Sequence, residues 1–218
     1  RMLKRSTAEH DSGLWKLNPK GTPATGKRAA IVGSGPTGLT AAYYLAKLGH
    51  STTIFEALPE PGGMMRVGIP DYRLPKDILK AEIEEIESIG IVIKTNMKID
   101  SVEGLFEQGY NAIFLAVGAH QGIRMDIEGE DNPGVMECIS FLRDVNLGKT
   151  VELGNRVAVI GGGNSGIEAA LDLAGIVKSV TVFEFMPTLK ADDVLVKQAE
   201  KRDNITILRN VATNQIVA

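Results

Sequence analysis

Two stretches of the chain repeat one pattern of hydrophobic and polar positions. The first, RAAIVGSGPTGLTAAYYLAKLGHSTTIFEA, begins at Arg28, and the second, RVAVIGGGNSGIEAALDLAGIVKSVTVFEF, begins at Arg156. Each opens with a short apolar run that is typical of a buried parallel strand. A helical spacing of apolar residues follows, and a β-branched run that ends on an acid closes each copy. Each copy therefore predicts a strand, a glycine turn, a helix and a second strand.

The glycines and closing acids of the two copies align without a gap, the acids each lying 23 residues after the first glycine: Gly33, Gly35, Gly38 and Glu56 fall on Gly161, Gly163, Gly166 and Glu184. The first glycine permits a tight turn, the second lets the backbone approach a pyrophosphate, and the third lets helix pack on strand. The helix N-terminus attracts phosphate, and the acid accepts hydrogen bonds from ribose hydroxyls. A βαβ unit without a ligand is the alternative for one copy, and the second copy weakens it. The repeat therefore predicts two dinucleotide sites, which suggests FAD and NAD(P)H.

Between the copies, the pattern predicts a helix after Pro75, with Pro75 in its first turn and Gly90 at its end. Its apolar stripe consists of Ile78, Leu79, Ile83, Ile86 and Ile89. IVIKT predicts the next strand, and YNAIFLAVG, from Tyr110, predicts a buried one. We therefore predict an α/β protein with two Rossmann-like units, divided near residues 118–155.

The segment Glu56–Lys76, EALPEPGGMMRVGIPDYRLPK, fits neither helix nor strand. It holds four prolines, three glycines and two adjacent methionines. A long irregular segment in a compact domain usually has a function or is disordered.

Composition narrows the possible functions. Of the 218 residues 44% are hydrophobic and 23% charged, and the net charge is −3, so nothing points to nucleic acid or an anionic membrane as partner. Cys138 is the one cysteine, which excludes a CxxC pair and a cysteine-bound metal or iron–sulfur site within this chain. The polar N-terminus lacks a signal-peptide core, and no apolar run reaches membrane-span length, so we expect a cytoplasmic protein.

GTPATGK, at Gly21–Lys27, matches the start of a P-loop, but it precedes a strand and Arg28 replaces the expected Ser/Thr, so we interpret it as a linker.

Three further motifs carry a resemblance to known flavoproteins. They are PGGMMRVGIPDYRLP at Pro61–Pro75, AVGAH at Ala116–His120 and FLRDVNLG at Phe141–Gly148. Residues 28 to about 166 resemble the small subunit of glutamate synthase and its relatives, including the corresponding region of dihydropyrimidine dehydrogenase. From about Gly161 the stretch GGGNSGIEAALDLAGIVKSVTVFEFMPTLKADDVL is similar to thioredoxin reductase and the flavoprotein subunit of alkyl hydroperoxide reductase.

The resemblance implies that FAD lies over the first glycine turn, with Glu56 on the ribose. The irregular segment then has a role, because its glycines let the backbone come close to the cofactor, and Met64 and Arg73 contact it. Ile99 is expected near the adenine, and Ala116–Gly118 on the flavin side. The alternative is an exposed loop whose Arg73 pairs with a nearby Asp. The residues assigned to FAD are Gly33, Gly35, Pro36, Thr37, Gly38, Glu56, Ala57, Gly63, Met64, Arg73, Ile99, Ala116, Val117 and Gly118.

The second turn is expected to bind a nicotinamide dinucleotide, NADH in preference to NADPH. Glu184 accepts from a free 2′-hydroxyl and repels a 2′-phosphate, which usually calls for a nearby Arg. FEFMPTLK has none, and Lys190 is the nearby cation that would soften the preference. The alternative is a surface Glu184 paired with Lys178 or Lys190. The residues assigned to this site are Gly161, Gly163, Asn164, Ser165 and Glu184.

In this superfamily NAD(P)H gives a hydride to the flavin, which passes electrons onward, so no metal site or catalytic triad is expected. The lone cysteine disfavours disulfide reduction and implies an external acceptor, such as an iron–sulfur protein or subunit. We expect an N-terminal extension at 1–27, an FAD-binding unit at 28–130 and an NAD(P)H-binding unit at 131–218. The segment that completes the FAD unit in the family is absent, which suggests a fragment, a reduced protein or a subunit completed by another chain. A non-catalytic dinucleotide-binding module is the second hypothesis.

Overall fold

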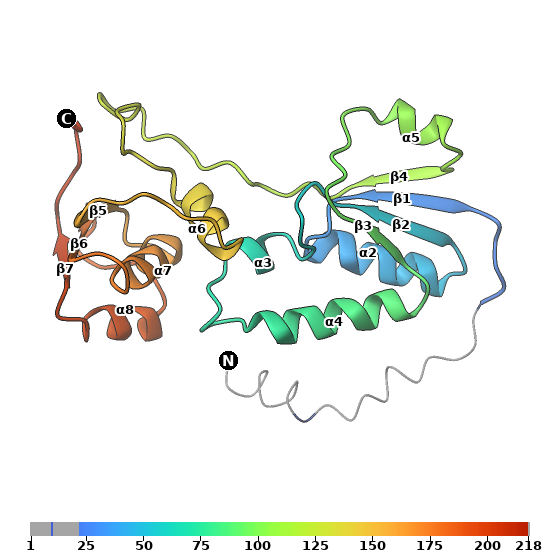
Figure 1. The fold of residues 1–218 in the computed structure, drawn as a ribbon, viewed down its shortest axis with the longest axis horizontal. Coiled ribbons are helices and arrows are strands. Elements are labelled where there is room, and N and C mark those ends of the chain that lie inside the picture. The colour runs from blue at the N-terminus through green and yellow to red at the C-terminus, as the bar shows by residue number, and fades with distance from the viewer. Residues whose placement is uncertain (1–9, 11–21, 218) are drawn as a thin grey trace.

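The structure, a computed structural model, describes residue 10 and residues 22–217. Its first unit is a four-stranded parallel sheet with the strand order β3-β2-β1-β4 (Figure 1). The strands are β1 (Arg28–Val32), β2 (Ser51–Phe55), β3 (Val92–Lys94) and β4 (Ala112–Leu115). Of the predicted N-terminal extension, residues 1–9 and 11–21 lie outside the described part, as does Gly21 of the P-loop-like stretch.

Helices cover both faces of this sheet. On one face α2 (Pro36–Lys47) and α4 (Lys76–Ser88) pack on the strands through a core that includes Ile31, Ile54 and Ile83. The other face holds α5 (Glu103–Glu107), where Leu105 is buried with Phe55. β1 lies between two strands and is almost entirely buried, so the first glycine turn projects from the centre of the sheet.

The second unit is a three-stranded parallel sheet with the order β5-β6-β7. Its strands are β5 (Arg156–Ile160), β6 (Ser179–Glu184) and β7 (Ile205–Arg209), and its helices are α6 (Cys138–Asn146), α7 (Asn164–Leu173) and α8 (Asp193–Ala199). A separate core forms around the apolar side of α7, with Ile167, Val180 and Val182 fully buried. The two glycine turns thus lie on different sheets, and the predicted α/β fold with two Rossmann-like units is confirmed.

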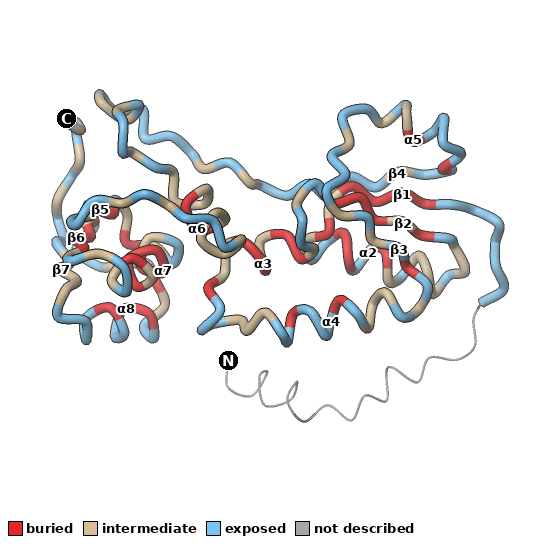
Figure 2. The backbone as a smooth tube through the Cα atoms, viewed as in Figure 1, coloured by how far each residue is buried: buried red, intermediate tan, exposed pale blue. Residues whose placement is uncertain are grey.

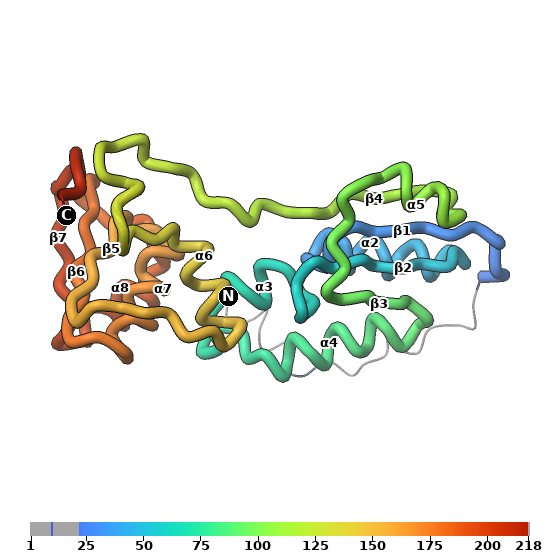
Figure 3. The backbone as a smooth tube through the Cα atoms, turned by 45° about the horizontal axis from the view of Figure 1, so that its top comes forward, coloured from blue at the N-terminus to red at the C-terminus, as the bar shows by residue number. Residues whose placement is uncertain are grey.

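The units meet through helices that lie between the sheets. Figures 1 and 3 both show α6 beside the short helix α3 (Met64–Val67), and Asn146 Nδ2 donates to the Val67 carbonyl at 3.1 Å. A long connector without a helix or strand runs from β4 to α6 (Figure 1). It touches the end of the second unit, where Ile216 N donates to the Glu128 carbonyl at 2.8 Å. Among the described residues no helix is both long enough and apolar enough to cross a membrane.

Two strands that the sequence predicts as buried are largely exposed. Leu115 in β4 is 59% exposed and Ile160 in β5 is 38% exposed, whereas β1 is red along most of its length in Figure 2. The reason is position: β4 and β5 are edge strands, and β1 is central. An apolar run specifies a strand, but burial depends on what packs beside it.

Three local predictions need correction. The irregular segment contains a helix, α3, which the Pro- and Gly-rich pattern concealed. Ile78 is 49% exposed and does not join the apolar stripe of α4, whose buried members are Leu79 and Ile83. Pro75 is the N-cap of α4 and precedes its first turn, with an extended ψ of 132°.

Candidate functional site

The fold itself requires two glycines of the first turn. Gly33 has φ +104°, and a Cβ there would lie 2.3 Å from the Ala116 carbonyl oxygen. A Cβ on Gly38 would lie 1.9 Å from the Gly33 oxygen, because the first turn of α2 presses on the end of β1. No side chain fits at either position.

Gly35 is different, because nothing in the protein excludes a side chain there. Its φ of −68° suits any residue, and a Cβ would meet only the Cα of Gly63, at 4.0 Å. Gly35 is also the N-cap of α2, and no side chain caps that helix end. An uncapped helix N-terminus with open space beside a glycine is the surface that a pyrophosphate needs. The first turn therefore has room for a pyrophosphate.

The closing acid of the first copy, Glu56, accepts hydrogen bonds from the glycine turn. Glu56 is 6% exposed, and its Oε2 accepts from Ser34 N at 2.9 Å and from Ser34 Oγ at 2.5 Å. Its Oε1 accepts from Leu58 N at 2.8 Å. A carboxylate offers about four acceptor positions, so three bonds leave capacity for a ribose hydroxyl.

The second turn reproduces this geometry. Gly161 has φ +109°, and a Cβ on Gly166 would lie 2.0 Å from the Gly161 oxygen. Gly163 has φ −79° and caps α7 without a side-chain bond, and a Cβ added there would have nothing within 4 Å. As at Gly35, a side chain would fit, so the fold itself does not require glycine at this position.

Glu184 closes the second site as Glu56 closes the first. It is 4% exposed, with Oε2 accepting from Gly162 N at 2.7 Å and Oε1 from Met186 N at 2.8 Å. Glu184 is therefore buried and bonded to backbone N–H groups, whereas the alternative was a Glu184 on the surface paired with a lysine. Arg209 lies opposite Glu184 in β7, so Lys190 is not the sole cation near the acid, although Arg209 Nη2 pairs with Glu200 at 3.0 Å.

The segment Glu56–Lys76 packs directly on the first turn. Gly62 N donates to Ser34 O at 3.2 Å and to Ser34 Oγ at 3.1 Å. Gly63 has φ +53°, and a Cβ there would lie 2.7 Å from the Cα of Gly35. Met64 follows as the first residue of α3. The segment therefore lies against the first turn, and its approach to a bound cofactor stays a prediction.

Arg73 lies at the other end of the same segment and reaches the second unit. Its Nη1 forms an ion pair with Glu168 of α7, and its Nη2 lies 3.6 Å from Asp192 Oδ2. The side chain of Arg73 is 31% exposed and that of Glu168 is 4% exposed. The structure thus places Arg73 between the units.

The remaining candidates lie beside one turn or the other. Pro36 and Thr37 are exposed in the first turn of α2, Ala57 is exposed next to Glu56, and Ile99 packs against the core around Phe55. Ala116 contacts the Gly33 position, Val117 is 60% exposed, and Gly118 has φ +67°. In the second unit Asn164 Oδ1 accepts from Asp192 N at 2.7 Å, and the Ser165 carbonyl accepts from Cys138 Sγ at 3.4 Å.

Sequence reasoning missed Ser34, Gly162 and Glu168. Ser34 and Gly162 occupy the variable position between the first two glycines, where the motif gives no signal. At Gly162 a Cβ would lie 2.4 Å from Leu189 Cδ2 and 2.8 Å from Glu184 Oε2, so these two side chains leave little room for any residue but glycine. Glu168 did carry a signal, since it is a charge within the apolar face of a predicted helix.

Burial shifts the pKa values of several titratable groups around the boundary between the units. Burial raises the pKa of Asp172 on α7 to about 6, against the opposing charge of Lys76. Burial raises the pKa of Tyr72 to about 12, with the nearby Asp172 adding to the shift. Burial also lowers the pKa of Lys76. Burial, followed by Glu137, raises the pKa of the Cys138 thiol to about 11, so this cysteine is protonated at neutral pH.

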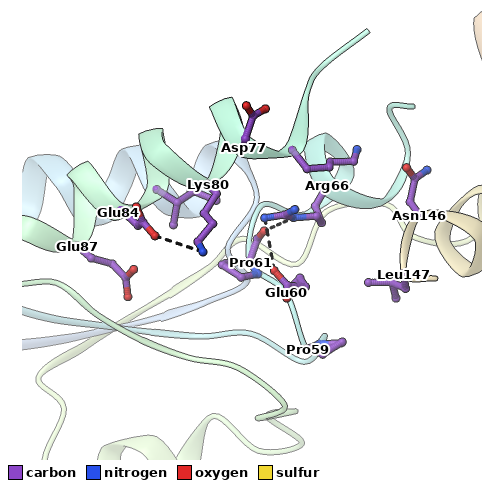
Figure 4. Close-up of a pocket in the computed structure, with 12 residues that line it drawn as sticks. Pro59, Glu60, Pro61, Arg66, Asp77, Lys80, Glu84, Glu87, Asn146 and Leu147 are labelled. Carbon is purple, nitrogen blue, oxygen red and sulfur yellow. Dashed lines mark hydrogen bonds and ion pairs between the residues drawn. The ribbon is translucent and has the colours of Figure 1, made fainter. Parts of the chain in front are cut away.

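A pocket of about 690 Å³ lies beside α4 and the end of α6 (Figure 4). It contains charges of both signs, with Arg66 3.4 Å from Glu60 and Lys80 3.7 Å from Glu84. None of its lining residues belongs to either glycine turn. The two turns are therefore the better candidates for nucleotide sites.

The family model for "Pyridine nucleotide-disulphide oxidoreductase" matches residues 28–218, and a second match covers residues 5–107. The chain belongs to this family. The longer match contains both glycine turns and both closing acids. Membership in the pyridine nucleotide-disulphide oxidoreductases agrees with the predicted resemblance, because the glutamate synthase small chain of Escherichia coli is 33% identical over 71% of this chain.

Two other family relatives are more similar. The NADP(+)-dependent formate dehydrogenase subunit beta of Moorella thermoacetica is 48% identical over 67% of this chain, and the NADPH-Fe(3+) oxidoreductase subunit beta of Geobacter sulfurreducens is 42% identical over 77%. The matched regions are 21%, 26% and 35% of the formate dehydrogenase, Fe(3+) oxidoreductase and glutamate synthase relatives. The chain therefore spans only about a fifth to a third of these proteins.

Solved structures of oxidoreductases share the fold. A 2-naphthoyl-CoA reductase complex has a TM-score of 0.76 at 29% identity, covering 90% of this chain and 30% of that one. Thioredoxin reductase from Lactococcus lactis has a TM-score of 0.64 at 23% identity, covering 88% of this chain and 67% of that one.

Proposed function

We propose that this chain is the dinucleotide-binding portion of an FAD-dependent oxidoreductase that takes hydride from NAD(P)H and passes electrons to an external acceptor. One observation carries the proposal: Gly35 and Gly163 occupy equivalent positions, neither is required by the fold, and each leaves open space at a helix N-terminus. A glycine that the protein does not need is best explained by the close approach of a ligand. Family membership supports FAD and NAD(P)H as the two ligands.

In this proposal the first turn and Glu56 hold the adenosine and pyrophosphate of FAD, and Gly62 and Gly63 bring the backbone of the irregular segment close to it. Bound FAD would supply the group that accepts hydride, and the protein contributes placement and electrostatics. The free N–H groups of α2 attract the phosphates, and Glu56 accepts from the ribose. Ala116–Gly118, at the end of β4, lie beside the same turn.

We propose NADH over NADPH for the second turn. Glu184 has two hydrogen bonds in the structure, which leaves acceptor capacity for both ribose hydroxyls. Its charge opposes a 2′-phosphate. NADPH is the alternative, since the names of the relatives carry NADP or NADPH and both Lys190 and Arg209 lie nearby.

The acceptor lies outside these 218 residues. Cys138 is the one cysteine, and its raised pKa keeps it a poorly nucleophilic thiol. An iron–sulfur protein or subunit is the acceptor we propose, and the cytoplasmic location expected from the sequence stays a prediction.

The test is FAD binding to the wild type and to Gly35→Ala, followed by the flavin absorbance retained after gel filtration. We expect the wild type to retain FAD and Gly35→Ala, equally well folded by circular dichroism, to retain much less. Equal retention by both proteins would place FAD elsewhere.

A further inference from the structure

The segment that contacts the first turn also reaches the second unit. At its start Gly62 binds Ser34 and Gly63 packs on Gly35. Near its end Arg73 contacts Glu168 and Asp192. One continuous stretch of chain therefore touches the surroundings of both dinucleotide turns.

Glu168 needs this contact. It lies on α7 between the buried residues Ile167 and Ala169, and its side chain is 4% exposed. An ionised carboxylate in such surroundings is costly unless it is paired. In the described part of the chain its ion-pair partner is Arg73, which belongs to the other unit.

Arg73 holds the elements that form the second turn. Glu168 lies about one helical turn after Asn164, the first residue of α7. Asp192 is the N-cap of α8, and its backbone N donates to Asn164 Oδ1. A single guanidinium thus contacts both helices that frame the second turn.

A second pair of opposite charges lies near the first. Asp172 lies four residues after Glu168, on the same face of α7. It interacts electrostatically with Lys76 and Tyr72, which flank Arg73 in the sequence. The 72–76 stretch therefore faces α7 with two cations, and α7 faces it with two acids.

We propose that Arg73 is a positioning residue whose ion pair with Glu168 docks the second unit on the first and fixes the two dinucleotide turns relative to each other. This role differs from the FAD contact that the resemblance assigns to Arg73, because the guanidinium is directed at the second unit. The docking role does not require that either nucleotide binds. Only the hydride-transfer measurement below rests on the proposed function.

The test compares Arg73→Gln, Glu168→Gln, the double variant and Arg73→Lys with the wild type. Lys80→Gln is the matched control, because it removes one positive charge from an exposed ion pair within the first unit. The readouts are the radius of gyration from X-ray scattering and the rate of proteolysis in the connector between β4 and α6. Far-UV circular dichroism establishes that each variant is folded.

We expect Arg73→Gln to raise the cleavage rate about tenfold, since it leaves a buried carboxylate without its partner. The radius of gyration should increase, Arg73→Lys should restore much of the wild-type behaviour, and Lys80→Gln should resemble the wild type. The double variant should be no worse than Arg73→Gln. Salt should change the wild type little, because a pair whose carboxylate is buried is screened much less than an exposed one.

A wild-type cleavage rate and radius of gyration in Arg73→Gln would overturn the proposal, as would equal opening of Lys80→Gln. If Glu168→Gln does not fold, Arg73→Gln and Arg73→Lys still decide the outcome. With both nucleotides at saturating concentration, Arg73→Gln should slow flavin reduction several-fold. If the wild type binds no nucleotide, the proposed function fails while the docking result stands.

Discussion

Gly163→Ala separates the needs of the ligand from the needs of the fold. The structure has nothing within 4 Å of the added methyl group, and φ of −79° suits alanine. Alanine is a poorer N-cap than glycine, but it also lowers the entropy of the unfolded chain. These effects oppose each other, so the free energy of unfolding should change by less than about 1 kcal/mol.

Nucleotide affinity should respond much more strongly. The methyl group projects into the space where a pyrophosphate would approach the N-terminus of α7, so it lengthens or removes a hydrogen bond to a charged group. Such a bond is worth roughly 1.5–3 kcal/mol, which corresponds to about 10- to 150-fold weaker binding. Gly166→Ala is the matched control, because its methyl group would lie 2.0 Å from the Gly161 oxygen and should cost at least about 2 kcal/mol of stability.

The assay is calorimetric titration of NADH and NADPH, with thermal unfolding measured on the same samples. The expected pattern is a stable Gly163→Ala that binds poorly and a destabilised Gly166→Ala. If Gly163→Ala binds the wild type's preferred nucleotide with wild-type affinity, the second turn does not hold a pyrophosphate and the reasoning from open space is wrong.

Three further substitutions test individual acids. Glu56→Gln should weaken FAD binding by roughly 1.5–3 kcal/mol in a flavin fluorescence titration, and unchanged affinity would exclude the ribose contact. Glu56→Ala is a poorer test, because the carboxylate also accepts hydrogen bonds from the N–H groups of Ser34 and Leu58. The wild type should prefer NADH over NADPH by roughly 5- to 150-fold and Glu184→Gln should lose that preference, whereas tighter NADPH binding by the wild type would reverse the assignment. Asp172 has a folded pKa of about 6 against an ordinary 3.8, so its contribution to stability is present at low pH and is lost as pH rises through that window. In chemical denaturation, the free energy of unfolding of Asp172→Asn should fall over this window by about 1 kcal/mol less than that of the wild type, after allowance for partial exposure. Identical pH profiles of the two proteins would contradict this.

The repeat made the two glycine turns predictable, because strand, turn and helix each follow from local pattern. The acids at Glu56 and Glu184 were predictable for the same reason. Burial of the strands was not, since β1 and β5 have similar apolar runs but β1 is central and β5 lies at an edge.

The destination of Arg73 could not be read from the sequence. Its motif suggested a loop close to a cofactor, and the start of that loop does pack on Gly35. The ion pair with Glu168 depends on how the two units dock, and the spacing of apolar residues along the sequence does not predict that docking. Ser34 was also unpredictable, because its bonds to Glu56 and Gly62 arise only when three separate segments meet.

In the proposed function, the two turns hold FAD and a reduced nicotinamide dinucleotide, and hydride passes between them. The most direct measurement is the visible spectrum of the protein loaded with FAD, recorded before and after anaerobic addition of NADH, and separately of NADPH. We expect a flavin spectrum that bleaches with reduced nucleotide in the wild type and bleaches far more slowly in Gly163→Ala. A protein that retains no FAD, or one whose flavin spectrum neither nucleotide changes, would contradict it.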